Sequence, residues 1–257
     1  MTFFKKISFI ASRLWEYNKL YFLKPHDAIN DTLTSSILKK LNWDDDIVEI
    51  GSGDGVFSYI MHGGKFSYEY DRYIYTDFSK QDIYDTPNKN IINPKKNLEF
   101  PNLVLSLDAK KSHVQKIREI GFSKSAQLVE YENLPLESNS IKKIFYYTPH
   151  GLKDHEKSIK EIYRVLKPEG RLIILLYDSV FKSSFISYKF SKNLKGYFGK
   201  LFKEIDNGRY LEITKLSKTK NEWSEFFRKN NFEIEKNYSG LSTTAWKFYD
   251  IQTRFIL

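Results

Sequence analysis

A short apolar run leads directly into a glycine-rich turn, and this feature restricts the fold more than any other in the sequence. Residues 47–50 (IVEI) have the pattern of a buried strand, residues 51–55 read GSGDG, and apolar residues at helical spacing follow from Val56. Glycines at alternate positions let a backbone approach a ligand closely, because a side chain there would collide with it. This order of strand, glycine turn and helix indicates an α/β fold that binds a ligand beyond the end of the strand.

Strand-like and helical segments continue to alternate along the chain. After the strand at 47–50, further strands are predicted at 103–107, 126–131, 141–147, 171–177, 232–238 and 246–256. One helix closes near Gly121, a helix over 154–167 is stopped by Pro168, and a helix is predicted at 223–229. The alternation predicts a doubly wound, mostly parallel sheet of seven strands.

A single domain spanning residues 1–257 suits one α/β unit with small additions. Its predicted parts are N-terminal helices (1–42), a ligand-binding core (47–178), an insertion (63–100), a substrate-cap segment (180–215), and a closing helix and strands (223–257). Each of the two N-terminal helices is expected to bury an apolar stripe. The stripes are Phe3, Ile7, Ile10, Leu14 and Tyr17 in the first helix, and Ile29, Leu33, Ile37 and Leu41 in the second.

Composition excludes several classes of chemistry. The chain has no cysteine, so disulfides, thiolate nucleophiles and cysteine-bound metal sites are excluded, and no metal site is predicted. The formal charge is +9, but the lysines form no single basic block, which disfavours a nucleic-acid partner. No apolar run is long enough to cross a bilayer, and the first residues lack a cleavage site for a signal peptide. We expect a cytoplasmic protein.

Three segments in the correct order resemble the class I S-adenosylmethionine-dependent methyltransferases, type 11-like. VEIGSGDG looks like the first motif of that family, ENLPLESNSIKKIFYY is similar to the segment before and through the fourth strand, and EIYRVLKPEGRLIILLYD resembles the helix, turn and fifth strand. The resemblance covers residues 47–178. Two positions depart from the family pattern: Lys142 replaces a usual aspartate, and Glu130 stands where aspartate is commoner.

The resemblance implies a Rossmann-like methyltransferase fold, S-adenosylmethionine as cofactor, and a set of residues around it. The amino-acid half of the cofactor would be lined by Glu49, Gly51, Ser52, Gly53 and Gly55. The adenine would lie near Glu130 and Tyr131, and Tyr147 and Thr148 would form walls of the pocket.

Two aspartates compete for the acid that would bind both ribose hydroxyls. Asp77 lies 26 residues after Gly51, close to the roughly 20 typical of nucleotide-binding units, whereas Asp108 lies 57 residues after it. Asp108, however, ends a strand that is followed by a helix and another strand, as the topology requires. We therefore place the ribose at Asp108 and keep Asp77 as the alternative.

The sequence says less about the methyl acceptor. His150 and His155 both follow the fourth strand. Either could act as a base if the acceptor must lose a proton, and His150 is the preferred candidate. The absence of an Asn/Asp-Pro-Pro-aromatic motif and of cysteine favours transfer to oxygen or nitrogen of a small molecule, glycan or lipid-linked sugar, and the tyrosine-rich insertion resembles a subgroup associated with surface glycans. A non-catalytic regulatory partner that binds the cofactor and an RNA methyltransferase are the alternatives.

A peripheral contact is also expected. Aromatic residues and lysines in the first 20 residues and in 180–203 suggest an amphipathic surface that covers the acceptor site and touches the inner face of a membrane. Nothing in the sequence indicates the oligomeric state.

Overall fold

The computed structural model describes residues 3–21, 25–41, 46–67, 103–147, 152–180, 193, 196 and 214–240. The chain divides into two compact units, Met1–Phe22 with Asp27–Leu175, and Leu23–His26 with Leu176–Leu257. The single-domain organisation stays a prediction. In the described ranges, no helix is both long enough and apolar enough to cross a membrane.

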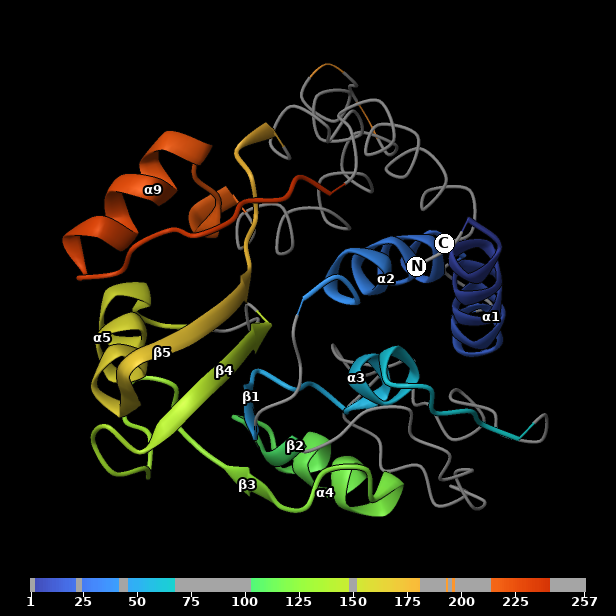
Figure 1. Ribbon diagram of the computed structural model, residues 1–257, viewed down its shortest axis with the longest axis horizontal. Coiled ribbons are helices and arrows are strands. Elements are labelled where there is room, and N and C mark those ends of the chain that lie inside the picture. Colours follow the sequence, from blue (N-terminus) through green and yellow to red (C-terminus); the bar gives the residue numbers. More distant parts are fainter. Residues whose placement is uncertain are drawn as a thin grey trace. The chain divides into compact units, whose positions relative to one another are not determined.

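The first unit contains a parallel sheet that confirms the doubly wound fold (Figure 1). Its strands are β1 (Ile47–Ile50), β2 (Leu103–Asp108), β3 (Ala126–Leu128), β4 (Ile141–Tyr147) and β5 (Leu166–Leu175). The spatial order is β3-β2-β1-β4-β5, and every neighbouring pair is parallel. The strand order therefore reverses at β1, and this reversal is the position where doubly wound sheets bind ligands.

Five strands are present in the described part of the chain, against seven predicted. Residues 232–238 are described, and they form neither strand nor helix, which corrects the prediction there. Their expected partner, residues 246–256, lies outside the described residues. A strand is defined by pairing with a neighbour, so an alternating apolar pattern alone was insufficient evidence.

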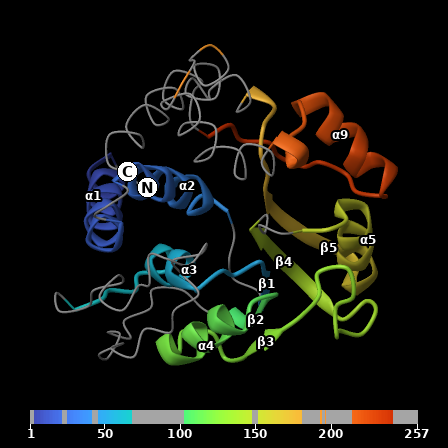
Figure 2. The same cartoon turned by 180° about the vertical axis from the view of Figure 1, so that it is seen from behind.

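Helices cover both faces of the sheet, as the alternation along β4 demonstrates. Phe145 packs in one cluster with Phe57 of α3 (Val56–Met61), their ring centroids 6.4 Å apart. The hydroxyl of the next residue, Tyr146, lies 3.2 Å from Ser158 Oγ of α5 (His155–Val165). Successive strand residues point to opposite faces, so α3 and α5 lie on opposite sides (Figure 1 and Figure 2).

The helix α4 (Lys111–Ile120) connects β2 with β3 and ends where predicted. Gly121 closes it in a left-handed conformation (φ 67°). Val114 and Ile117 of α4 pack with Ala126 of β3, and Ile120 joins the cluster that contains α3. The helix α4 thus covers the same face of the sheet as α3.

The N-terminal helices α1 (Phe3–Leu20) and α2 (Pro25–Leu38) form where predicted, but the predicted buried faces are only partly right, because Tyr17 is buried and Leu14 and Leu41 pack against the core while other predicted positions face outward. In α1 the buried residues are Phe9, Arg13, Glu16, Tyr17 and Leu20, whereas Phe3 and Ile7 are exposed. In α2 the buried residues are Ala28, Asp31, Thr32, Ser35 and Leu38, whereas Ile29 and Leu33 are exposed.

Hydrogen bonds explain why polar side chains face inward from α1. Tyr17 donates its hydroxyl proton to the carbonyl oxygen of Phe57 at 3.0 Å, and the same hydroxyl lies 2.9 Å from Ser35 Oγ of α2. Arg13 Nε donates to the carbonyl oxygen of Met61 at the end of α3, at 3.3 Å. The carbonyl oxygen of Met61 lies at the C-terminal end of α3, where backbone carbonyls need donors, and the polar edge of α1 docks there.

The junction of α5 and β5 differs slightly from the prediction. The helix ends at Val165, and β5 begins at Leu166, before Pro168 rather than after Gly170. A residue that precedes proline is disfavoured in the helical conformation, which ends the helix early. The pairing of β5 with β4 then shifts register between Ile141 and Lys143.

The second unit contains α9 (Lys220–Lys229), which confirms the helix predicted at 223–229. Thr219 and Glu222 form a capping box at its start, and Trp223 Nε1 donates to the carbonyl oxygen of Tyr177 at 3.0 Å. Most of the predicted insertion and of the substrate-cap segment lies outside the described residues.

Candidate functional site

The glycine turn follows β1 at the point where the strand order reverses. Gly51, Gly53 and Gly55 have φ angles of 72°, 56° and 79°, in the left-handed region that favours glycine. The backbone N–H groups of Gly51 and Ser52 donate to the carbonyl oxygen of Leu107 in β2, at 2.9 and 3.3 Å. The turn is thus held against the end of β2.

Gly53 and Gly55 differ in what surrounds them. A Cβ atom at Gly53 would meet no heavy atom of the protein within 4 Å, whereas a Cβ atom at Gly55 would lie 2.9 Å from both Ile117 and Phe122. Gly55 therefore permits packing against Ile117 of α4 and against Phe122, two residues beyond the end of that helix. The open space beside Gly53 is where a ligand could approach the backbone.

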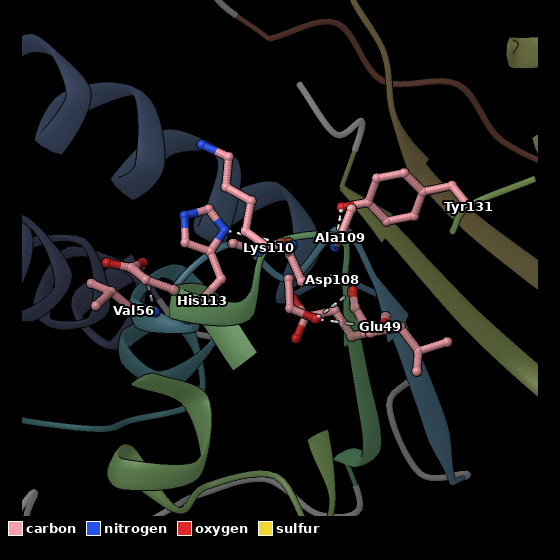
Figure 3. A network of polar contacts seen from close by, with 11 residues as sticks. Glu49, Val56, Asp108, Ala109, Lys110, His113 and Tyr131 are labelled. Carbon is pink, nitrogen blue, oxygen red and sulfur yellow. Dashed lines mark hydrogen bonds and ion pairs between the residues drawn. The ribbon is translucent and has the colours of Figure 1, made fainter. Parts of the chain in front are cut away.

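Asp108 ends β2 opposite the glycine turn (Figure 3). Its Oδ2 accepts a hydrogen bond from Gly53 N at 2.8 Å, and its Oδ1 accepts one from Lys110 N at 2.9 Å. The imidazole Nδ1 of His113 lies 3.0 Å from Oδ1. The structure thereby joins the glycine turn of the first motif to Asp108, the acid that the sequence favoured for the ribose, although 55 positions separate Gly53 from Asp108.

Glu49 lies inside the sheet beneath this network. Only 1% of the residue is exposed, Ser58 Oγ of α3 donates to its Oε1, and Ser106 Oγ of β2 donates to its Oε2 at 3.5 Å. Burial raises the pKa of Glu49 to about 8; the hydrogen bond from Ser58 lowers it and the charge of Asp108 raises it further. Glu49 therefore ties β1, β2 and α3 together below the turn.

Tyr131 and Glu130 follow β3 and differ in exposure. Tyr131 is buried, and its hydroxyl accepts a hydrogen bond from Ala109 N at 3.1 Å, directly beside Asp108 (Figure 3). Burial, and then the charge of Asp108, raise the pKa of Tyr131 above its usual value. The Glu130 residue is exposed, and its backbone forms an isolated bridge with Asn133. Tyr131 therefore offers a buried wall to the site, and Glu130 offers a solvent-facing carboxylate.

Tyr147 ends β4 and packs edge-on against Phe57, with ring centroids 5.0 Å apart. This contact connects the ends of β4 and of the glycine turn, which Phe57 follows. Three other candidates, Asp77, Thr148 and His150, lie outside the described residues. His155 is the first residue of α5, and the preceding Asp154 caps that helix by accepting from Glu156 N and Lys157 N.

Sequence reasoning missed several residues that shape the site. His113 and Ser58 were missed because each is a polar residue within a helix and belongs to no recognised sequence motif. A second group fastens the loop after β3 to α5: Glu132 accepts from Lys153 N and Asp154 N, Glu161 accepts from Leu134 N, and Arg164 donates to the carbonyl oxygens of Leu134 and Leu136. These contacts hold Tyr131 and its neighbours in place.

Solved structures share this fold. An S-adenosylmethionine-dependent methyltransferase from Thermotoga maritima superimposes with a TM-score of 0.50 at 18% identity, covering 88% of this chain and 81% of that one. A chain in the complex of the Haloferax volcanii Trm112 methyltransferase activator with a methyltransferase gives a TM-score of 0.50 at 14% identity, covering 89% and 77%. No curated protein matches the sequence.

A family comparison agrees with the site geometry. The methyltransferase-domain family matches residues 48–174, which run from β1 through the glycine turn, Asp108 and Tyr131 to β5. That span covers nearly all of the parallel sheet with the turn at its switch point, and it contains the first two motifs and most of the third. Residues 48–174, just under half of the chain, therefore match the methyltransferase-domain family, and the protein is an S-adenosylmethionine-dependent methyltransferase.

Proposed function

We propose that this methyltransferase binds the ribose of S-adenosylmethionine at Asp108 and transfers the methyl group to an oxygen or nitrogen of a small molecule, glycan or lipid-linked sugar. The hydrogen bond from Gly53 N to Asp108 Oδ2, at 2.8 Å, carries the cofactor part of the proposal. It brings a carboxylate that can accept ribose hydroxyls next to a turn that lets a ligand approach its backbone.

The neighbouring residues supply the rest of the proposed cofactor site. Glu49, Gly51, Ser52, Gly53 and Gly55 would line the amino-acid half. Tyr131 would form a wall beside the adenosine, since its ring is buried and its hydroxyl is held at Ala109 N. The exposed Glu130 would accept a hydrogen bond from the adenine amino group. Tyr147 would close the pocket from the end of β4.

Substitution of Asp108 tests this assignment. Asp108→Asn keeps the size of the side chain but replaces one acceptor oxygen with a donor, so a bound ribose loses at least one hydrogen bond to a charged group. We expect the affinity for S-adenosylmethionine, measured by calorimetry, to fall by about ten- to a hundredfold. Asp77→Asn is the matched variant. Weaker binding in Asp77→Asn with unchanged binding in Asp108→Asn would transfer the role to Asp77.

Methyl transfer requires little from the protein except the correct placement of the acceptor and the cofactor. An acceptor lone pair attacks the methyl carbon in line with the carbon–sulfur bond, the bonding pair returns to sulfur, and the cofactor leaves as a neutral thioether. Holding the two reactants in that geometry supplies most of the acceleration. We propose His150 as the base that removes the proton where the acceptor carries one, with Thr148 as part of the pocket wall.

The acceptor and the location of the protein form the last part of the proposal. We infer a cytoplasmic enzyme with a peripheral contact to the inner face of a membrane, made by α1. Phe3, Phe4, Ile7 and Trp15 of α1 are exposed large hydrophobic residues, and Lys5 and Lys6 are exposed beside them. Such a face suits an amphipathic acceptor delivered at an anionic lipid surface. A protein that binds the cofactor but methylates no acceptor in this class would be the regulatory partner instead.

A further inference from the structure

The carboxylate of Asp108 is already occupied by the protein's own donors. A carboxylate offers about four acceptor positions on its two oxygens. Gly53 N uses one on Oδ2, Lys110 N and His113 Nδ1 use two on Oδ1, and the hydroxyl of Tyr131 is hydrogen-bonded to the carboxylate as well. A ribose that donates both hydroxyls needs two positions, so at least one of these donors must leave when the ribose binds.

These donors differ in how easily they can leave, and Tyr131 is a buried residue with little room to move away. The N–H groups of Gly53 and Lys110 belong to the backbone, and Gly53 lies in a turn whose neighbours Gly51 and Ser52 are bound to Leu107. His113 reaches Asp108 through a side chain that can rotate, and that side chain is 14% exposed, against 5% for Asp108. The imidazole therefore has a path toward solvent that the backbone donors lack.

Helix geometry explains how His113 comes to be there. It is the third residue of α4, and Asp108 precedes the start of that helix by three residues. Side chains on a helix tilt toward its N-terminus, so His113 points back over the first turn to the carboxylate (Figure 3). Without a ligand, its N–H supplies a further donor to a buried acid whose charge needs hydrogen bonds.

We propose that the imidazole of His113 occupies one of the two ribose-hydroxyl positions on Asp108 and is displaced when the cofactor binds. This inference rests on the proposed role of Asp108 as the ribose acid. His113 is then an internal competitor of the cofactor: it lowers the affinity of the site and keeps the carboxylate hydrogen-bonded while the site is empty.

The first test compares two substitutions of His113. His113→Leu removes the donor, whereas His113→Asn places an amide N–H close to the position of Nδ1. We expect the dissociation constant for S-adenosylhomocysteine, measured by calorimetry, to fall by about two- to tenfold in His113→Leu and to stay near the wild-type value in His113→Asn. Circular dichroism and urea unfolding establish that both variants are folded.

The second test removes one hydroxyl from the ligand at a time. In the wild type, His113 can refill the position that a missing hydroxyl vacates on Asp108, so one of the two deoxy analogues, 2′-deoxy- or 3′-deoxy-S-adenosylhomocysteine, should lose little affinity. In His113→Leu that position stays empty, and the same analogue should lose about two- to tenfold more affinity than in the wild type. A purely structural role for His113 would affect both analogues alike.

The displacement of His113 can also be observed directly from its nitrogen-15 resonance. In protein labelled with nitrogen-15 in histidine, the Nδ1 resonance of His113 should shift on saturation with S-adenosylhomocysteine, and His113→Asn identifies the signal by its loss. Unchanged or weaker binding in His113→Leu, or an Nδ1 resonance that the ligand does not move, overturns the proposal. Unchanged binding in Asp108→Asn would instead refute the ribose assignment, so the two failures are distinguishable.

Discussion

Gly53 and Gly55 both have left-handed backbones, but a side chain would be disfavoured for different reasons at the two positions. A Cβ atom at Gly53 would face space that is free of protein atoms within 4 Å, and one at Gly55 would face Ile117 and Phe122 at 2.9 Å. The first glycine is expected to serve the ligand, and the second serves the packing of the protein. Substitution by alanine should separate the two functions.

We expect Gly53→Ala to lower the free energy of unfolding by only about 1–2 kcal/mol, the cost of a left-handed alanine. Its affinity for S-adenosylmethionine should fall about tenfold or more, because the methyl group enters the ligand's volume. Gly55→Ala should cost about 2–4 kcal/mol of stability, since overpacking adds to the backbone strain. Urea unfolding and calorimetry measure the two effects. Full affinity in a folded Gly53→Ala protein would contradict the placement of the cofactor.

At the scale of elements, α1 docks by its polar edge and turns an apolar face outward. Arg13 and Tyr17 bind carbonyl oxygens of α3, whereas Phe4 and Trp15 are 81% and 57% exposed. Tyr17 and Leu20 are fully buried in the same cluster as Phe57. The helix is therefore part of the core, and point substitutions on its outer face test a peripheral contact better than removal of the whole helix would.

We expect the double substitution Phe4→Ser and Trp15→Ser to reduce co-sedimentation with vesicles containing anionic lipid by about tenfold, because two aromatic side chains lose their burial in the interface. Binding of the wild type should also weaken as salt screens Lys5 and Lys6. Leu128→Ser, at an exposed residue of β3, is the matched control and should leave binding unchanged. Equal sedimentation of the wild type and the double variant would show that this face does not contact lipid.

At the scale of the whole molecule, the buried Glu49 couples global stability to pH. Its pKa is raised by burial from 4.5 to about 8, so between these values the folded protein keeps a proton that the unfolded chain has released. Stability must then fall as pH rises through this window, by up to about 1.4 kcal/mol per pH unit, and level off above it.

Glu49→Gln removes this titration. The difference in unfolding free energy between wild type and variant, measured in urea from pH 5 to pH 9, should therefore shift in favour of the variant as pH rises. Glu137→Gln, at an exposed residue of the loop before β4, controls for the loss of one carboxylate. Parallel pH profiles of the wild type and Glu49→Gln would mean that Glu49 is already ionised at pH 5.

Local chemistry in the sequence was sufficient for much of the fold. The glycine turn between an apolar run and a helix, the end of α4 at Gly121, and the alternation of strands and helices depend on neighbours in the chain, so they could be predicted and are confirmed. The choice of Asp108 as the acid beside the turn came from the same ordering. The structure places that carboxylate at Gly53, while its role toward the ribose stays a prediction.

Other features depended on contacts between distant segments, which no local pattern contains. Part of the buried face of α1 depends on α3, because Arg13 donates to the carbonyl oxygen of Met61 while Phe3 and Ile7 of the predicted apolar stripe are exposed. Residues 232–238 had the alternation of a strand but form no strand in the described chain. Likewise, the sequence determined that a carboxylate would end β2, but only tertiary structure could bring Gly53 N onto its Oδ2, because the hydrogen bond joins atoms 55 positions apart that folding has made neighbours.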